Sequence, residues 1–281
     1  MPAVDFNRLK VLSLESRRAI EIARLIENYG GIAISAPAMR EVPLADNHDA
    51  LNFARALIAE QFDVVVFLTG VGARALHQVL TEAQLAEQFV AALRKVKVTV
   101  RGPKPLAVMR EWNVPVAAAA PEPNTWKELL IALAGMDGGL IGQRVVVQAY
   151  GVSNEELLAA LRERGAIVTE VAVYRWDLPL NTAPLREAVL QLIDRQIDVA
   201  LFTTGVQLVH LFRIADEMKE RENLKAAFQN VIVASIGPDT SETLGKFGIA
   251  VDLETSHPKM GVLVKEAAER SGLLISRKRT N

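Results

Sequence analysis

Glycine, threonine and positively charged residues gather in short turns that follow apolar runs. The stretch FLTGVGARAL, which begins at Phe67, comes directly after three valines and contains Gly70, Gly72 and Ala75. Gly-x-Gly-x-x-Ala after a strand is one form of the dinucleotide-binding turn, whose second glycine lets the backbone approach a pyrophosphate. A nucleotide-dependent enzyme is therefore one hypothesis for this chain.

A second turn, 135 residues further along, argues against that hypothesis. It reads TTGVQLVHL, so the Thr-Gly pair is kept and Gln207 stands in the place of Gly72. The strand after the first turn, KVKVTV, is followed by Arg101 and not by the acidic residue that binds a ribose. Both turns share a strand, Thr-Gly and a helix, which present backbone N–H groups and a hydroxyl to a carboxylate or phosphate.

Positive charges also lie where strands end. RGPKP, from Arg101 to Pro105, closes one apolar run and opens a helix, so two cations accompany the N–H groups of a helix start. Arg17 follows the first strand, and Arg74 lies one turn into the helix after Thr69-Gly70. Taken singly, each of these is more often a solvated surface cation than a ligand. Their shared place at the ligand-binding edge of an α/β sheet makes them candidates for binding an anion.

Composition excludes several kinds of site. The chain has 281 residues, no cysteine, and four histidines that lie far apart, which excludes thiol nucleophiles and thiolate metal sites and disfavours a histidine metal site. The formal net charge is −1, and hydrophobic residues make up 50%, so nothing points to a nucleic-acid or membrane surface. No Ser-His-Asp order, paired catalytic carboxylates, P-loop, signal peptide or membrane-spanning run is found. We expect a cytoplasmic protein without a cofactor.

Ten short apolar runs alternate with amphipathic helical stretches along the chain. One such helix is Asp49–Glu60, in which Leu51, Ala54, Leu57 and Ile58 form one apolar stripe. This alternation predicts parallel sheets covered by helices on both faces, and hence an α/β fold. We expect buried strands at Val11–Leu14, Ile32–Ser35, Val64–Leu68, Val96–Val100, Val116–Ala119, Val145–Gln148, Ile167–Val173, Val199–Thr203, Val231–Ile236 and Ala250–Leu253.

The two halves of the chain repeat at one fixed offset. A shift of 135 residues places Asp63-Val64 on Asp198-Val199 and Gly102-Pro103 on Gly237-Pro238. The same shift places a glycine, a proline and an arginine elsewhere on residues of their own type. Separated matches without a net insertion indicate two similar α/β units, and a cleft between two such units is a common place for a ligand.

The chain resembles the uroporphyrinogen-III synthase family, whose members close the linear tetrapyrrole hydroxymethylbilane. The resemblance covers roughly residues 8 to 270. Many members have Thr-Arg-Pro after the first strand, whereas this chain has Ser13-Leu14-Glu15-Ser16-Arg17. The resemblance rests on the order and spacing of DVVVFLTGVGARAL, VTVRGPKPLAVMREWNVP, EVAVYRWD, DVALFTTGVQLVHLF, VASIGPDTSETLGKFGI and SHPKMGVLVKEA.

The resemblance implies two similar domains, each a five-stranded parallel sheet flanked by helices (flavodoxin-like), joined by two linker strands with a cleft between them. Because the linkers cross, one domain is discontinuous. Carried onto this chain, this gives one domain of residues 1–38 with 179–281 and a second of residues 44–173. The linkers then fall at residues 38–44 and 173–179.

The chemistry that the family implies needs no strong acid or base and no cofactor. The substrate loses its hydroxyl as water, which leaves an azafulvenium cation. The terminal pyrrole, ring D, attacks this cation through its substituted carbon. Fragmentation and re-closure then leave ring D inverted in uroporphyrinogen III. The activity implied is that of a lyase (hydro-lyase). The protein's main task is to fold the substrate so that the symmetric isomer does not form, and to shelter the cation.

The resemblance also implies roles for particular residues. Tyr174 matches the tyrosine that the family places at the cleft, where its phenol would donate a hydrogen bond to the departing hydroxyl. The alternative is a hinge tyrosine that packs against Arg175 and Trp176. The carboxylates of the substrate are expected to bind to Arg17, Thr69, Gly70, Arg74, Arg101, Gly102, Lys104, Thr203, Thr204, Gly205, Gly237 and Thr240.

Partners and a competing function follow from the same features. We expect a monomer that receives hydroxymethylbilane from hydroxymethylbilane synthase and has no nucleic-acid or membrane partner. The alternative function is a non-catalytic two-domain module that binds an anionic tetrapyrrole or another polyanion, because N–H-rich turns bind without catalysing. The ratio of asymmetric to symmetric macrocycle separates these two functions, and titration with NAD(P)H tests the nucleotide hypothesis.

Overall fold

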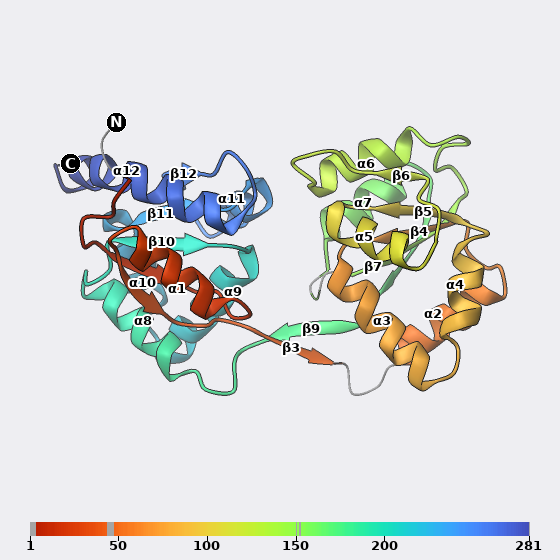
Figure 1. The fold of residues 1–281 in the computed structure, drawn as a ribbon, viewed down its shortest axis with the longest axis horizontal. Coiled ribbons are helices and arrows are strands. Elements are labelled where there is room, and N and C mark those ends of the chain that lie inside the picture. The colour runs from red at the N-terminus through yellow and green to blue at the C-terminus, as the bar shows by residue number, and fades with distance from the viewer. Residues whose placement is uncertain (1–3, 44–47, 150, 152, 281) are drawn as a thin grey trace. The chain divides into compact units, whose positions relative to one another are not determined.

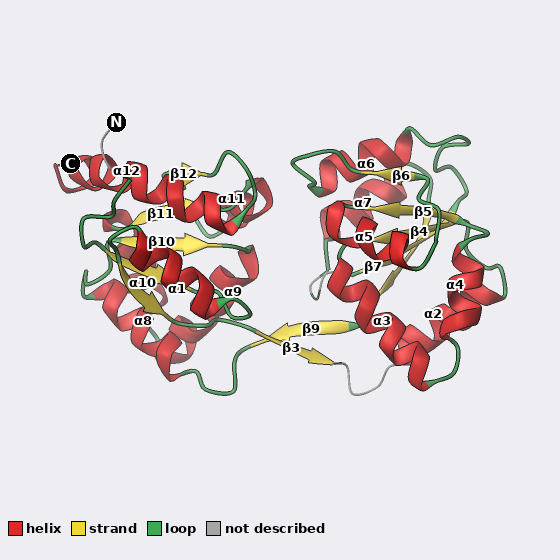
Figure 2. Ribbon diagram, viewed as in Figure 1, coloured by secondary structure: helices red, strands yellow, loops and turns green. Residues whose placement is uncertain are grey.

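The structure, a computed structural model, describes residues 4–43, 48–149, 151 and 153–280 (Figure 1). The chain divides into two compact units: unit 1 is Met1–Arg40 with Asp177–Asn281, and unit 2 is Glu41–Trp176. Each unit holds a five-stranded parallel sheet with helices on both faces (Figure 2). The α/β fold with two five-stranded sheets is therefore confirmed.

Unit 1 has the strand order β12-β11-β10-β1-β2. Numbered along the unit, this is the order 2-1-3-4-5 of flavodoxin. Its strands are β1 (Lys10–Ser13), β2 (Ile32–Ser35), β10 (Val199–Phe202), β11 (Ile232–Ser235) and β12 (Leu253–Glu254). Its helices are α1 (Ala19–Asn28), α8 (Ala183–Ile193), α9 (Gly205–Met218), α10 (Arg221–Ala227), the short 3₁₀ helix η1 (Phe228–Asn230), α11 (Pro238–Lys246) and α12 (Met260–Thr280).

Unit 2 has the strand order β6-β5-β4-β7-β8. The spatial arrangement matches that of unit 1, but the chain enters at a different strand, so the order along the unit is 3-2-1-4-5. Its strands are β4 (Val64–Phe67), β5 (Lys97–Val100), β6 (Ala118–Ala119), β7 (Arg144–Gln148) and β8 (Ile167–Val171). Its helices are α2 (His48–Ile58), α3 (Gly70–Glu82), α4 (Ala86–Leu93), α5 (Pro103–Glu111), α6 (Trp126–Ala134) and α7 (Glu155–Glu163).

Two further short strands lie within the expected linker segments. β3 (Arg40–Pro43) and β9 (Tyr174–Asp177) pair with each other in a separate two-stranded sheet (Figure 1). The Arg40 Nε donates to the carbonyl of Leu178 (2.9 Å), so the two segments are also joined by a side chain.

Equivalent hydrogen bonds at the first residues of β7 and β1 show the internal repeat. In unit 2 the Arg144 N–H donates to Oδ2 of Asp63 (2.8 Å), and in unit 1 the Lys10 N–H donates to Oδ2 of Asp198 (2.8 Å). Asp63 also pairs with the Arg144 guanidinium, and the hydrogen bond from that group lowers the pKa of Asp63. Residues 63 and 198 are the aspartates that the 135-residue shift superimposes, so the shift predicted a real structural equivalence.

The core of unit 1 lies on both faces of its sheet because neighbouring strand residues point to opposite sides. Leu12 belongs to one apolar cluster with residues of α8 and α9, and Val11 belongs to another with residues of α1 and α12. In unit 2, Val64 and Val66 pack in one cluster with leucines of α6 and α7.

The expectation that all ten strands are buried is wrong at the sheet edges. The inner strands β4, β10 and β11 are buried throughout, whereas β2 and β8 carry exposed residues, among them Ile32 and Ile167. An edge strand has a neighbour on one side only and lies near the limit of the helix layers. An apolar run in the sequence does not distinguish an inner strand from an edge strand.

Candidate functional site

The two Thr-Gly turns lie where the strand order of each sheet reverses. In unit 2 this switch point falls between β4 and β7, and in unit 1 it falls between β10 and β1. Open α/β sheets bind ligands outside the carboxyl ends of the strands at such a point. The turns after β4 and β10 are the two Thr-Gly turns found in the sequence.

The turn after β4 begins α3 with a threonine cap. The Thr69 hydroxyl accepts from the Gly72 N–H (3.0 Å), which satisfies one of the unpaired donors at the helix start. Thr69 is buried, whereas Thr204, which caps α9, is half-buried and makes no side-chain cap hydrogen bond. The two turns are thus equivalent in backbone but not in how the threonine side chain is used.

The first glycine of each turn allows a neighbouring helix to approach the start of its own helix closely. A Cβ on Gly70 would lie 2.9 Å from the carbonyl oxygen of Lys104 in α5. A Cβ on Gly205 would lie 2.4 Å from the Thr243 Oγ1 in α11. Packing therefore requires both glycines, whatever else they do.

The second glycine of the first turn is explained by a buried side chain. A Cβ on Gly72 would lie 2.1 Å from Nε2 of Gln148, the last residue of β7. The space that a dinucleotide-binding turn keeps for a pyrophosphate is filled here by this amide. This packing removes the basis of the nucleotide hypothesis at Gly72.

The RGPKP segment lies at the carboxyl end of β5. The Arg101 N–H donates to the carbonyl of Phe67 (3.1 Å), and α5 begins at Pro103 after Gly102. The equivalent turn of unit 1 has the same form, because the Ile236 N–H donates to the carbonyl of Phe202 (3.0 Å). Arg101 is half-buried, and the Lys104 side chain is exposed.

Arg74 faces another helix of its own unit. Its Nη2 lies 2.7 Å from Oε1 of Glu111 in α5, and both side chains are exposed. Hydrogen bonding to Glu111 raises the pKa of Arg74 and lowers that of Glu111, so both are charged at neutral pH. Any anionic ligand of this guanidinium would have to compete with Glu111.

The loop after β1 is organised by Glu15, which the sequence reasoning did not select. Its Oε1 accepts the backbone N–H groups of Arg17 (3.1 Å) and Arg18 (3.3 Å). Its Oε2 accepts from the hydroxyl of Thr203 (2.6 Å), at the end of the neighbouring strand β10. An internal carboxylate therefore occupies backbone donors that an external anion would otherwise use. The only signal in the sequence was the departure from Thr-Arg-Pro.

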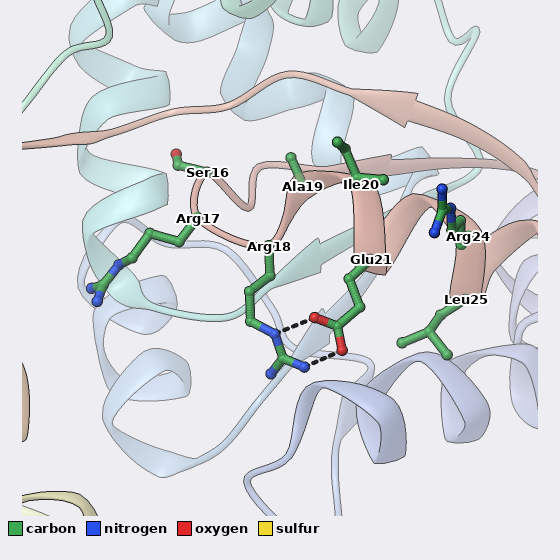
Figure 3. A pocket seen from close by; sticks show the side chains of 8 residues that line it. All are labelled: Ser16, Arg17, Arg18, Ala19, Ile20, Glu21, Arg24 and Leu25. Atoms are coloured by element: carbon green, nitrogen blue, oxygen red, sulfur yellow. Dashed lines mark hydrogen bonds and ion pairs between the residues drawn. The ribbon is translucent and has the colours of Figure 1, made fainter.

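A shallow hollow of about 540 Å³ lies beside this loop and the start of α1. Arg17, Arg18 and Arg24 line it, but their guanidinium groups point to different sides (Figure 3). Arg18 forms a bidentate pair with Glu21, whose hydrogen bond raises the pKa of Arg18. The three arginines do not converge on one point as a carboxylate site requires.

The turn after β11 is held by serines. The Ser235 hydroxyl donates to the Gly237 carbonyl (3.0 Å) and accepts from the Gly237 N–H (3.3 Å) and the Ser241 hydroxyl (2.9 Å). Thr240, a candidate ligand, is 4% exposed, and its N–H donates back to the Gly237 carbonyl (3.1 Å).

Most candidates of each unit thus gather at the carboxyl edge of its sheet, and the two exceptions are Arg74 and Tyr174. Arg74 is directed to the flank of α5. Tyr174 belongs to β9, and its side chain lies outside the described part of the structure, so its role stays a prediction. At the carboxyl edge of unit 2 lie Thr69, Gly70, Arg101, Gly102 and Lys104, and at that of unit 1 lie Arg17, Thr203, Thr204, Gly205, Gly237 and Thr240.

Among the described residues, no group of three or more histidine, aspartate or glutamate side chains is placed to hold a metal ion. Within the same residues, no helix has the length and apolar character needed to cross a membrane.

The fold and its turns define a class: two-unit α/β proteins with an N–H-rich Thr-Gly turn at the switch point of each sheet. The model of the family described as uroporphyrinogen-III synthase HemD matches residues 20–265. The chain belongs to the uroporphyrinogen-III synthase family.

Relatives and solved structures agree with this assignment. A protein of Methanothermobacter thermautotrophicus with the provisional name uroporphyrinogen-III synthase is 31% identical over 233 residues, which cover 83% of this chain and 87% of the relative. A crystal structure of Thermus thermophilus uroporphyrinogen III synthase is 25% identical, covers 95% of this chain and 98% of its own, and has a TM-score of 0.57. A mutant of that synthase, 24% identical with 95% and 99% covered, has a TM-score of 0.74 and supports the fold.

Proposed function

We propose that this chain is a lyase that converts hydroxymethylbilane to uroporphyrinogen III, with loss of water and inversion of ring D. The observation that carries the proposal is the family match across residues 20–265. The Thr-Gly turns at both switch points support it, because a substrate that bears eight carboxylates suits N–H-rich turns and a few cations.

The chain's part in the reaction is mainly geometric. Hydroxymethylbilane closes readily to the symmetric isomer without an enzyme, so the protein must hold ring D such that the substituted carbon attacks. Arg101 and Lys104 are the proposed carboxylate partners in unit 2, since both lie at the carboxyl end of β5. In unit 1 the proposed donors are the turn at Thr204-Gly205 and the loop that carries Arg17.

Tyr174 is the proposed catalytic residue. A tyrosine phenol is protonated at neutral pH and can donate a hydrogen bond to the departing hydroxyl. Residue matching to the family supports this role, and β9 places the backbone of Tyr174 in the two-stranded linker sheet. We further propose a cytoplasmic monomer that takes its substrate from hydroxymethylbilane synthase and uses no cofactor.

The test is a coupled assay that starts from porphobilinogen and hydroxymethylbilane synthase. The products are oxidised, and the two porphyrin isomers are separated by chromatography. We expect the chain to shift the product from isomer I to isomer III. If isomer I alone forms while the chain still binds hydroxymethylbilane, the protein is a binding module and the proposed activity is wrong.

A further inference from the structure

A buried glutamine lies at the switch point of each unit, but it comes from a different element in each. In unit 2 it is Gln148, the last residue of β7, and in unit 1 it is Gln207 in α9. Both side chains are 1% exposed. A buried amide costs free energy unless it is hydrogen-bonded, so its presence in both units needs a reason.

The Gln148 amide joins the end of β7 to the turn after β4. Its Nε2 donates to the carbonyl of Ala149, and its Oε1 accepts a long hydrogen bond from the Thr69 N–H (3.4 Å). Gly72 is the residue that leaves room for it, because any Cβ there would overlap the amide.

In unit 1 the Gln207 amide also binds a backbone N–H group of the turn, one residue earlier than in unit 2. Its Oε1 accepts from the Thr203 N–H (2.8 Å), and its Nε2 donates to the Thr203 hydroxyl (2.8 Å). That hydroxyl in turn donates to Glu15 in the loop after β1. The Gln207 amide therefore binds within its own turn, and the Thr203 hydroxyl and Glu15 connect that turn to the loop after β1.

The repeat shows that the two amides do not occupy equivalent positions in the chain. The residue equivalent to Gln207 is Gly72. When β1 is aligned with β7 by the register of each with its neighbouring strand, the residue equivalent to Gln148 is Leu14. The buried amide at the switch point therefore belongs to the helix in one unit and to the strand in the other.

We propose that Gln148 and Gln207 are positioning residues that hold the two Thr-Gly turns in the conformation that binds the carboxylates of the substrate. This inference rests on the proposed function. Each amide fixes the backbone at a turn where close approach of a carboxylate depends on the direction of the N–H groups. Leucine fills part of this space without the hydrogen bonds, and it is one bond shorter, so it lacks the Nε2 atom that lies nearest to a Cβ on Gly72.

The experiment transplants the arrangement of unit 1 into unit 2. The variants are Gln148→Leu, Gly72→Gln and the double variant, with Gln191→Leu as a matched control. Gln191 lies on α8, and its amide donates within that helix to Glu187 (3.1 Å). For each variant, KM and kcat for hydroxymethylbilane, the isomer ratio and the melting temperature are measured.

We expect Gln148→Leu to raise KM about five- to tenfold, with kcat changed less than about twofold, which corresponds to roughly one hydrogen bond. Gly72→Gln alone should lose most activity, because its side chain overlaps Gln148. The double variant should return KM to within about threefold of the wild type, because the amide introduced at position 72 replaces the one removed at position 148. The difference that remains is then smaller than the contribution of one hydrogen bond. The Gln191→Leu control should keep the KM of the wild type.

An unchanged KM in Gln148→Leu, even with a lower melting temperature, would show that the amide is structural and overturn the inference. Should Gln148→Leu fail to fold, the double variant decides: recovery of fold and KM supports positioning, and failure of either overturns it. Failure of the proposed function is separate, because wild-type protein would then produce no isomer III.

Discussion

The carboxylate of Glu15 should be the main stabilising group of the loop after β1. The loss of free energy of unfolding on its removal follows from its hydrogen bonds. It accepts the Thr203 hydroxyl at 2.6 Å and two backbone N–H groups at 3.1 and 3.3 Å. A hydrogen bond to a charged group contributes about 1.5–3 kcal/mol, and an ordinary one about 1 kcal/mol. Because water replaces the partners of the exposed N–H groups, we expect Glu15→Ala to cost about 2 kcal/mol.

That cost corresponds to a fall in melting temperature of about 4–8 °C for a unit of this size. Thermal unfolding followed by circular dichroism measures it. Glu15→Gln should lose about half as much, because its remaining oxygen still accepts the N–H groups of Arg17 and Arg18, whereas its NH₂ cannot accept from Thr203. Glu27→Ala, on the exposed side of α1, is the matched control and should leave the melting temperature unchanged.

The KM for hydroxymethylbilane should rise in Glu15→Ala as well, since the loop carries Arg17. A melting temperature within about 1 °C of the wild type would refute the reasoning, because three hydrogen bonds removed at once exceed that change. An equal loss in Glu15→Gln and Glu15→Ala would show that the hydrogen bond to Thr203 carries all of the effect.

Three further predictions concern the site and the pH dependence. Arg101→Ala should raise KM at low salt and raise it much less at high salt, where screening already weakens an exposed ion pair in the wild type. A KM at low salt equal to that of the wild type would place Arg101 outside the site. Tyr174→Phe should lower kcat while the melting temperature stays the same, and wild-type kinetics would remove the phenol from the chemistry. Burial lowers the pKa of His210, whose Nδ1 lies 2.8 Å from the Ala38 carbonyl oxygen. As the pH falls below the ordinary histidine pKa of 6.5, residue 210 therefore takes up a proton in the unfolded chain before it does so in the folded one. The free energy of unfolding should then fall from pH 7 toward pH 5. In His210→Asn it should fall less. Denaturant titrations across this range test it, since the carboxylates with lowered pKa, such as Asp63, act only at lower pH.

Local patterns were enough to predict the elements and their repetition. Apolar runs predicted nine of the ten strands of the two sheets well, whereas the run at Ala250–Leu253 overlaps β12 only at Leu253. The helix expected at Asp49–Glu60 is found at His48–Ile58. These features depend on residues close in the chain, whose periodicity follows from strand and helix geometry. The repeat likewise predicted that Asp63 and Asp198 are equivalent, because a fixed offset is itself a sequence property.

Tertiary structure alone decided what the individual turn residues do. Gly72 has the spacing of a nucleotide-binding glycine, yet Gln148, a neighbour only through the pairing of β4 with β7, fills the space beside it. Thr203 resembled a ligand-facing hydroxyl, but that hydroxyl donates its hydrogen bond to Glu15, 188 residues away. The order of strands in a sheet determines which carboxyl ends meet, and no local pattern encodes that order. The sequence therefore determined where the turns are, and the packing of distant strands determined which of their groups remain for a substrate.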